Sequence, residues 1–225
     1  MIYNYDIKFM AVPNRLANVL KCLNFLKLRY SDVALDEKCE KKPIKTMMKA
    51  LRMPHDETIT HRVIAQDDVE FGSKFRDNVS FLINNYPDNV FSLFIAGSSK
   101  KELYKTEDKI ICKTGGGIWG QAVIIPLKYM SDIEGHLTML DEKWQHDDIF
   151  LQYVFSRLGV KVLTTIPCIV DHLGKGKEKS AMEHGWGESD NYRYDRDADV
   201  SEFVPKLNMS LGINRSYSID KYIRV

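Results

Sequence analysis

Runs of apolar residues alternate along this chain with stretches in which apolar positions recur every three or four residues. A short continuous apolar run is typical of a buried strand, and the three-to-four spacing is typical of an amphipathic helix. The pattern predicts helices near 16–26, 43–51, 75–86 and 149–158. It predicts strands near 7–12, 31–35, 59–65, 90–96, 110–112 and 122–125, and one last extended run over 162–166 and 169–170. This alternation favours an α/β fold with a mostly parallel, Rossmann-like central sheet flanked by helices.

The chain changes character after residue 174. A basic stretch with glycines follows at 175–179, residues 188–199 are almost entirely polar, and a short apolar segment returns at 203–213. We therefore expect residues 1–174 to form the main domain. Residues 175–225 are expected to form a loop-rich C-terminal tail that packs on the same domain.

Length and composition narrow the class of protein. A chain of 225 residues is long enough to bury a full core, and a net charge of +1 points to neither a nucleic-acid nor a membrane partner. No apolar stretch approaches the ~18 residues of a membrane span, and the N-terminal residues lack the pattern of a secretory leader. The four cysteines are scattered without metal-site spacing, which favours reduced, mostly buried thiols. We expect a cytoplasmic protein without membrane insertion.

The candidate chemistry lies where predicted strands end. Asp67 and Asp68 follow one apolar run, the turn from Val12 to Arg15 follows another, and His172 closes a third. In open α/β sheets ligands collect beyond the carboxyl ends of the strands. Adjacent carboxylates there are costly to hold together unless a cation or a proton separates their charges. Carboxylate and imidazole ligands suit a divalent metal, and the imidazole favours Mn²⁺ over Mg²⁺.

Each of these residues also has a purely structural interpretation. Asp147 and Asp148, at the start of a predicted helix, are placed to stabilise the helix N-terminus. Asp67 and Asp68 are equally compatible with a surface turn, and His172 with an ordinary histidine at a strand end. The glycines at 115–117 are compatible with a flexible hairpin, and they lack the residues that complete a P-loop.

The order of these features resembles a small glycosyltransferase of the GT-A type, which moves a sugar from a nucleotide diphosphate. The turn containing Val12, Pro13 and Arg15 is similar to the family's nucleotide-contacting turn. Gln66-Asp67-Asp68 is similar to its DxD-type metal motif, although the first acid is replaced by glutamine. The stretch containing Trp119 and Gly120 is similar to the glycine-rich segment on the sugar side. The resemblance covers about residues 7–180, and its strength is the order of the motifs.

The resemblance implies a role for each matching residue. Asp68 and His172 would bind Mn²⁺ or Mg²⁺ on the diphosphate of a donor such as a UDP- or GDP-sugar. The donor itself would contact Val12, Pro13, Arg15, Gln66, Asp67, Trp119 and Gly120. Asp148, or its neighbour Asp147, would be the catalytic base of an inverting hexosyl- or pentosyltransferase. These roles make residues 1–174 a GT-A-like catalytic domain.

The acceptor is predicted less directly. Lys45, Lys49 and Arg52 form a basic stripe on one predicted helix, which is either a solvated face or a contact for phosphates. Lys175 and Trp186 lie beyond His172 and are candidates to contact the acceptor. Small chains with this motif order resemble some encoded by bacteriophages, which implies as acceptor a hydroxymethylated base in phage DNA, inside the host cytoplasm. A surface glycan or a lipid-linked acceptor, a metal-dependent hydrolase or nuclease, and a non-catalytic binding domain remain alternatives.

Overall fold

The computed structural model describes residues 3–40, 42–95, 108–114, 117–173, 194–210 and 219–224. Within these residues, eight strands form one central sheet in the order β10-β6-β8-β5-β7-β3-β1-β2. The strands are β1 (Tyr5–Ala11), β2 (Val33–Leu35), β3 (His61–Gln66), β5 (Val90–Ser92), β6 (Ile110–Lys113), β7 (Ala122–Pro126), β8 (Val162–Ile166) and β10 (Val204–Ser210).

The sheet is mixed, with parallel pairing in the majority. β1 pairs in parallel with both β2 and β3, β5 with β8, and β6 with β10. β7 is antiparallel to β3 and β5, and β6 is antiparallel to β8. The strands β1, β2, β3, β5 and β8 therefore share one direction, and their carboxyl ends lie at one edge of the sheet. The predicted fold class, a mostly parallel α/β sheet flanked by helices, is confirmed.

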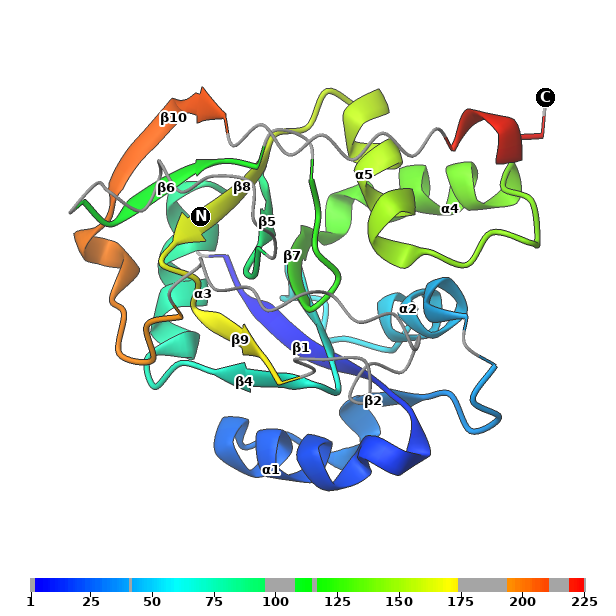
Figure 1. Ribbon diagram of the computed structural model, residues 1–225, viewed down its shortest axis with the longest axis horizontal. Coiled ribbons are helices and arrows are strands. Elements are labelled where there is room, and N and C mark those ends of the chain that lie inside the picture. The colour runs from blue at the N-terminus through cyan, green and yellow to red at the C-terminus, as the bar shows by residue number, and fades with distance from the viewer. Residues whose placement is uncertain are drawn as a thin grey trace.

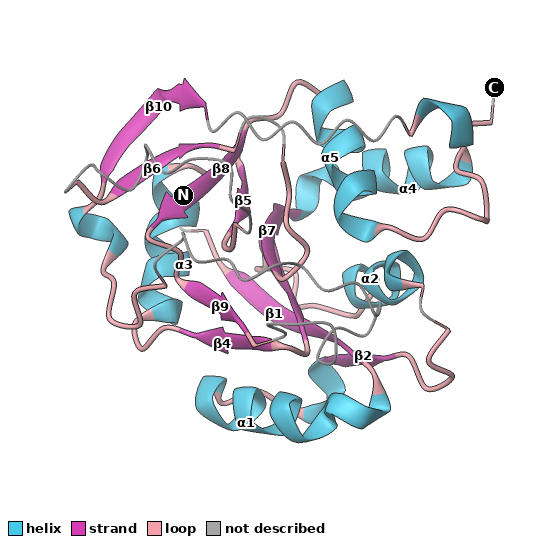
Figure 2. Ribbon diagram, viewed as in Figure 1, coloured by secondary structure: helices cyan, strands magenta, loops and turns pink. Residues whose placement is uncertain are grey.

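Helices cover both faces of the sheet (Figures 1 and 2). α1 (Leu16–Leu26) and α3 (Phe75–Asn85) bury their apolar sides in one core, and α2 (Pro43–Leu51), α4 (Met130–Thr138) and α5 (Asp147–Arg157) share the other. Neighbouring strand residues alternate between the two cores, so that Phe9 lies in the first and Met10 in the second. This alternation follows from the two-residue period of a strand, and it explains why the central strands are apolar throughout.

A second, two-stranded sheet forms from β4 (Val69–Phe71) and β9 (Val170–His172). The two strands are antiparallel, and Val69 lies opposite His172. The sequence pattern treated 162–166 and 169–170 as one extended run, which is wrong, because β8 stays in the central sheet while β9 leaves it. The departure of β9 from the central sheet sets His172 beside the residues that follow β3.

Three elements were not predicted, and one strand was predicted too long. α4, β4 and β10 lack a long periodic signal, and the strand expected over 90–96 is β5, which ends at Ser92. β10 adds to the central sheet beside β6, so part of the chain beyond residue 175 pairs directly with the sheet. Nearby, the side-chain amide of Asn78 in α3 donates to the carbonyl of Ala198 at 2.8 Å.

The described cysteines agree with the expected reduced thiols. Cys22, Cys112 and Cys168 are buried, Cys39 is exposed, and none of the four is in a disulfide. Burial raises the pKa of Cys22 to about 11, which keeps that thiol protonated and unreactive near neutral pH. Over the described ranges, every helix is too short or too polar to traverse a lipid bilayer.

A fully buried arginine ties β3 to β1 and α2. The guanidinium of Arg62 pairs with both carboxylate oxygens of Asp6, at 2.8 and 2.6 Å, and donates to the carbonyls of Ala50, Leu51 and Met53. Ala50 and Leu51 lie in the last turn of α2, where carbonyls run out of intrahelical partners, and Met53 follows the helix end. Arg62 therefore binds the end of α2 and a partly buried carboxylate with one side chain.

We predict that Arg62→Ala lowers the free energy of unfolding by about 3–5 kcal/mol, because it removes the bidentate partner of the partly buried Asp6 carboxylate and the donor to three carbonyls. Urea denaturation measures the change. Arg52→Ala is the matched control, since Arg52 makes an equally bidentate but exposed pair with Glu134. The control should cost about 1 kcal/mol or less. Equal losses in the two variants would contradict this account of Arg62.

Candidate functional site

The turn after β1 and the turn after β3 meet at the carboxyl edge of the sheet. The backbone N–H of Val12 donates to Asp67 Oδ2 at 2.8 Å. Arg15, at the end of the 3₁₀ turn Pro13–Arg15, places Nη1 3.1 Å from Asp67 Oδ1 and 2.5 Å from Asp68 Oδ2. One guanidinium nitrogen therefore bridges the two adjacent carboxylates that the sequence identified as needing a cation.

His172 approaches the same acids from β9. Its Nε2 lies 3.1 Å from Asp68 Oδ2, and the backbone N–H of Leu173 donates to the Asp68 carbonyl at 2.7 Å. The imidazole packs edge-on against the ring of Phe94, with 5.7 Å between centroids. Backbone pairing of β9 with β4 thus holds the imidazole against Asp68, so the structure brings these two predicted site residues together.

The two carboxylates differ in their environment. Both Asp67 oxygens accept protein hydrogen bonds, whereas Asp68 Oδ1 is buried and has no hydrogen-bond partner among the described residues. Burial raises the pKa of Asp67, and the charge of Asp68 adds to the increase. Burial also acts to raise the pKa of Asp68, but the hydrogen bonds and charges of His172 and Arg15 outweigh it and lower that pKa. Asp68 is therefore the ionised carboxylate with an oxygen to spare.

These residues fit a divalent cation that is shared with a ligand. In the described part of the chain, no three His, Cys, Asp or Glu side chains are arranged as a metal cage. Mg²⁺ usually takes only one or two carboxylates from the protein and completes its shell with phosphate oxygens and water. Asp68 Oδ1 and the His172 imidazole are the two groups here that would hold such an ion, and phosphates would supply the remaining ligands.

A second cluster joins Gln66, Gly120 and Asp147 at the same edge. A Cβ added at Gly120 would lie 2.8 Å from Gln66 Nε2 and 3.4 Å from Asp147 Oδ2, so only glycine leaves both side chains in place. The Gln66 side chain also hydrogen-bonds the Asp147 carboxylate. Gln66 is therefore the contact between the acidic pair after β3 and the start of α5.

The first two residues of α5, Asp147 and Asp148, differ in their burial and in their hydrogen bonds. Burial, followed by the charge of Asp148, raises the pKa of Asp147 to about 7, although hydrogen bonds from backbone N–H groups and from Gln66 act to lower it. Asp148 is partly exposed, and its Oδ1 accepts the backbone N–H of Ile149 at 2.8 Å. Both acids also occupy the first turn of the helix, so the structural role predicted for them coexists with any chemical role.

The remaining residues that were predicted to contact the donor or the acceptor, where the structure describes them, make contacts within the protein. Trp119 is only 7% exposed, its backbone N–H donates to Ser92 Oγ at 3.0 Å, and little of its ring is open to a sugar. The basic stripe on α2 has partners within the protein: Lys45 pairs with Glu40, Lys49 donates to the Leu35 carbonyl, and Arg52 pairs with Glu134. Lys175, Trp186 and the glycines at 115 and 116 lie outside the described residues.

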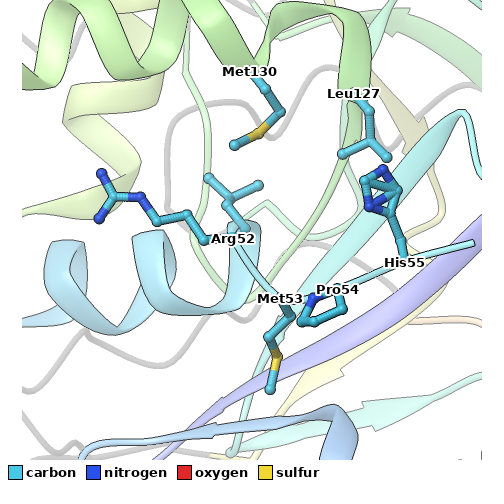
Figure 3. Close-up of a pocket in the computed structure, with 7 residues that line it drawn as sticks. Arg52, Met53, Pro54, His55, Leu127 and Met130 are labelled. Atoms are coloured by element: carbon cyan, nitrogen blue, oxygen red, sulfur yellow. The ribbon is translucent and has the colours of Figure 1, made fainter. Parts of the chain in front are cut away.

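A separate hollow of about 460 Å³ lies away from these acids (Figure 3). It is lined by Leu51, Arg52, Met53, Pro54, His55, Leu127 and Met130, which flank the start of β3 and the end of β7. That is the opposite edge of the sheet from Asp67 and Asp68. In Figure 3 the guanidinium of Arg52 extends away from the other lining residues, which leaves the hollow mostly apolar and without the chemistry of the acidic edge.

Two supporting residues carried no signal in the sequence. Asn18 in α1 donates from its side-chain amide to the carbonyls of Asp67 and Val69, at 2.7 and 3.3 Å, and so fixes the turn that carries the acids. Phe94 follows β5 and packs against both His172 and Trp119. Both roles become visible only in the structure, where the ends of β1, β3, β5 and β9 lie close together.

Comparison with known proteins finds a weak similarity to a solved structure and no match in sequence. No family model matches the chain, and no curated protein matches its sequence. Among solved structures, a mutant of Drosophila β-1,4-galactosyltransferase 7 in complex with manganese, UDP-Gal and xylobiose is similar, with 12% sequence identity and a TM-score of 0.43. The match covers 70% of this chain and 64% of that chain, less than two thirds of the latter's length. The function must therefore be argued from the residues of this chain.

We predict that Asp147→Asn stabilises the protein more at pH 8 than at pH 5. The folded state holds the Asp147 proton up to about pH 7, whereas an unfolded chain releases it near pH 4. Stability is therefore lost as the pH rises from about 4 to about 7, and the loss persists above that. The asparagine removes it, so the melting temperature should rise by several degrees at pH 8, at about 2–4 °C per kcal/mol.

The matched control is Asp132→Asn, which removes an exposed acid from the first turn of α4. It should leave stability unchanged or lower it slightly at both pH values, because only a favourable helix-end charge is lost. A melting temperature of Asp147→Asn below wild type at pH 8 would refute the destabilising burial of this carboxylate.

Proposed function

We propose that this protein is a metal-dependent glycosyltransferase that moves a sugar from a nucleotide diphosphate to an acceptor hydroxyl. The observation that carries the proposal is the buried Asp68 Oδ1, an ionised carboxylate oxygen with no hydrogen-bond partner among the described residues, beside the imidazole of His172. A buried polar atom without a partner costs free energy, so its retention needs a reason. A cation that arrives together with a diphosphate provides one.

On the donor side, the chain supplies two ligands and one fixed positive charge. A divalent ion held by Asp68 and His172 would act as a Lewis acid that stabilises the negative charge of the departing diphosphate. Arg15 already lies against both acids and is placed to pair with a phosphate once a cation takes over their charge. The turn from Val12 to Arg15 and the side chain of Gln66 would border the donor.

On the acceptor side, a carboxylate must take the proton of the attacking hydroxyl. As the new bond from the acceptor oxygen to the anomeric carbon forms, the bond from that carbon to the diphosphate oxygen breaks, and the proton passes to the base. The order of motifs along the sequence, compared with GT-A glycosyltransferases, favours Asp148 as this base. The position of Asp147 beside Gln66 and Gly120, with a pKa of about 7, favours Asp147 instead. We assign the base to Asp147, and Asp148 then serves the helix start.

The acceptor of the sugar is also proposed, and two candidates are compared: a base in DNA and the hydroxyl of a glycan. A hydroxymethylated base in phage DNA would need a basic surface near the acids. Of the basic stripe on α2, Lys45 and Arg52 pair with acids of the protein, and Lys49 donates to the carbonyl of Leu35. We therefore place the hydroxyl of a glycan ahead of DNA. A nuclease acting through the same acids would cleave DNA with no nucleotide-sugar present, which separates it from both.

We predict that nucleotide-sugar binding needs Mn²⁺ and Asp68. A thermal-shift panel of UDP-, GDP-, CMP- and TDP-sugars, with and without Mn²⁺, identifies the donor, since a ligand at 100 times its Kd stabilises by about 2.7 kcal/mol. Asp68→Asn should abolish the Mn²⁺-dependent part of that binding, and His172→Ala should weaken it about 10- to 100-fold. Calorimetry measures both.

Glu70→Gln is the control for this experiment. It removes a carboxylate from β4, two positions from Asp68, and leaves the cluster of Arg15, Asp67, Asp68 and His172 intact. It should bind donor as wild type does. Wild-type donor affinity in Asp68→Asn with Mn²⁺ present would rule out the metal role.

We predict that Asp147→Asn cuts sugar transfer by ~10²-fold or more while donor affinity stays within about twofold of wild type. Asp148→Asn should lower transfer far less. The product should have inverted anomeric configuration, because a single displacement assisted by one base inverts the carbon. NMR of the product decides the stereochemistry, and a retained configuration would argue against a base at either position. A large loss only in Asp148→Asn would move the assignment to Asp148.

A further inference from the structure

The last described residues of the chain, 219–224, lie along the loop that leads into α5. Leu140 and Ile223 form an antiparallel bridge. On either side of it, the N–H of Asp141 donates to the Tyr222 carbonyl at 2.8 Å and the N–H of Arg224 donates to the Met139 carbonyl at 2.7 Å. In Figure 1 this segment, coloured red, lies beside α4 and α5 and far from β10. Segments distant in sequence therefore hold the loop from one side.

An aromatic contact continues from this segment into the loop. The rings of Tyr222 and Trp144 are 4.9 Å apart between centroids and tilted by 55°, within the range of favourable aromatic pairs. The other neighbour of Trp144 is the ring of His146, at 5.4 Å. Trp144 is 8% exposed, and its indole N–H donates to the carbonyl of His146 at 2.8 Å. The indole is thus held by a ring contact and fixes a backbone group in turn.

The fixed group is the residue from which α5 starts. His146 is the N-cap of α5, and its carbonyl also accepts the N–H of Phe150 in the first turn of the helix. The next residue is Asp147, whose carboxylate lies so close to Gly120 that a Cβ there would be 3.4 Å from its Oδ2 and 2.8 Å from Gln66 Nε2. The sequence of contacts from Tyr222 to Trp144, to His146 and to Asp147 is continuous.

We propose that Tyr222 is a positioning residue, which acts through Trp144 to set the first turn of α5 and with it the Asp147 carboxylate. The inference rests on the proposed function for its consequence in sugar transfer. Catalysis by a positioned group is sensitive to its placement, and a displacement of about 1 Å costs roughly 10²-fold in rate. Tyr222 thus supports the acidic site from the far side of the loop, without touching substrate.

The test compares three variants of the full chain. Tyr222→Ala removes the ring, Tyr222→Phe keeps it, and Ile223→Ala removes a neighbouring side chain that packs on the same core. The first readout is the NMR signal of the Trp144 indole N–H, assigned with Trp144→Phe, together with the backbone amides of Asp147 and Asp148. Tyr222→Ala should shift these signals and speed exchange of the indole proton, whereas Tyr222→Phe and Ile223→Ala should preserve them.

The second readout is sugar transfer. Tyr222→Ala should lower kcat about tenfold or more with the donor KM within twofold of wild type, and Tyr222→Phe should restore kcat. Unchanged indole and amide signals in Tyr222→Ala would overturn the inference, as would a loss of kcat in Ile223→Ala equal to that in Tyr222→Ala. If wild type transfers no sugar, the proposed function fails, but the NMR comparison still decides whether Tyr222 positions the start of α5.

Discussion

The carboxyl edge of this sheet depends on one guanidinium group that lies between two adjacent carboxylates. Without the Nη1 of Arg15 against Asp67 and Asp68, the two negative charges would repel each other in a place where water is largely excluded. The same bridge joins the turn after β1 to the turn after β3. β4 then pairs with β9, which sets His172 against Asp68. The placement of each candidate ligand therefore follows from how this charge cluster is neutralised.

The site retains groups that stability alone would not select. A buried carboxylate oxygen on Asp68 has no hydrogen-bond partner among the described residues, and the Asp147 carboxylate has a pKa near 7 because it is buried beside a second acid. Proteins often accept such costs where activity needs strained or charged groups. One substitution, Asp147→Asn, is accordingly expected to make the fold more stable and to reduce the proposed sugar transfer, a combination that a structural helix cap would not produce.

Much of the fold was predictable from the sequence, because apolar periodicity is a local signal that long helices and central strands express clearly. Asp67, Asp68 and the turn after β1 were predictable as members of one edge, since parallel strands place their carboxyl ends together. His172 was expected at the same edge, but it lies there because β9 pairs with β4. The break between β8 and β9 was not predictable, because both read as extended apolar sequence and only the pairing with β4 separates them. Nor were Asn18, Phe94 or Tyr222, whose roles depend on contacts between segments far apart in the chain.

The most direct test of this account is to locate the metal itself. Crystals grown with Mn²⁺ and a nucleoside diphosphate, UDP or GDP, would show the ion by its anomalous scattering. The account predicts one peak within coordination distance of Asp68 Oδ1 and the imidazole of His172, bridged to the diphosphate, with Arg15 turned towards a phosphate. A diphosphate bound elsewhere, or bound at this edge with no ion at Asp68, would contradict it.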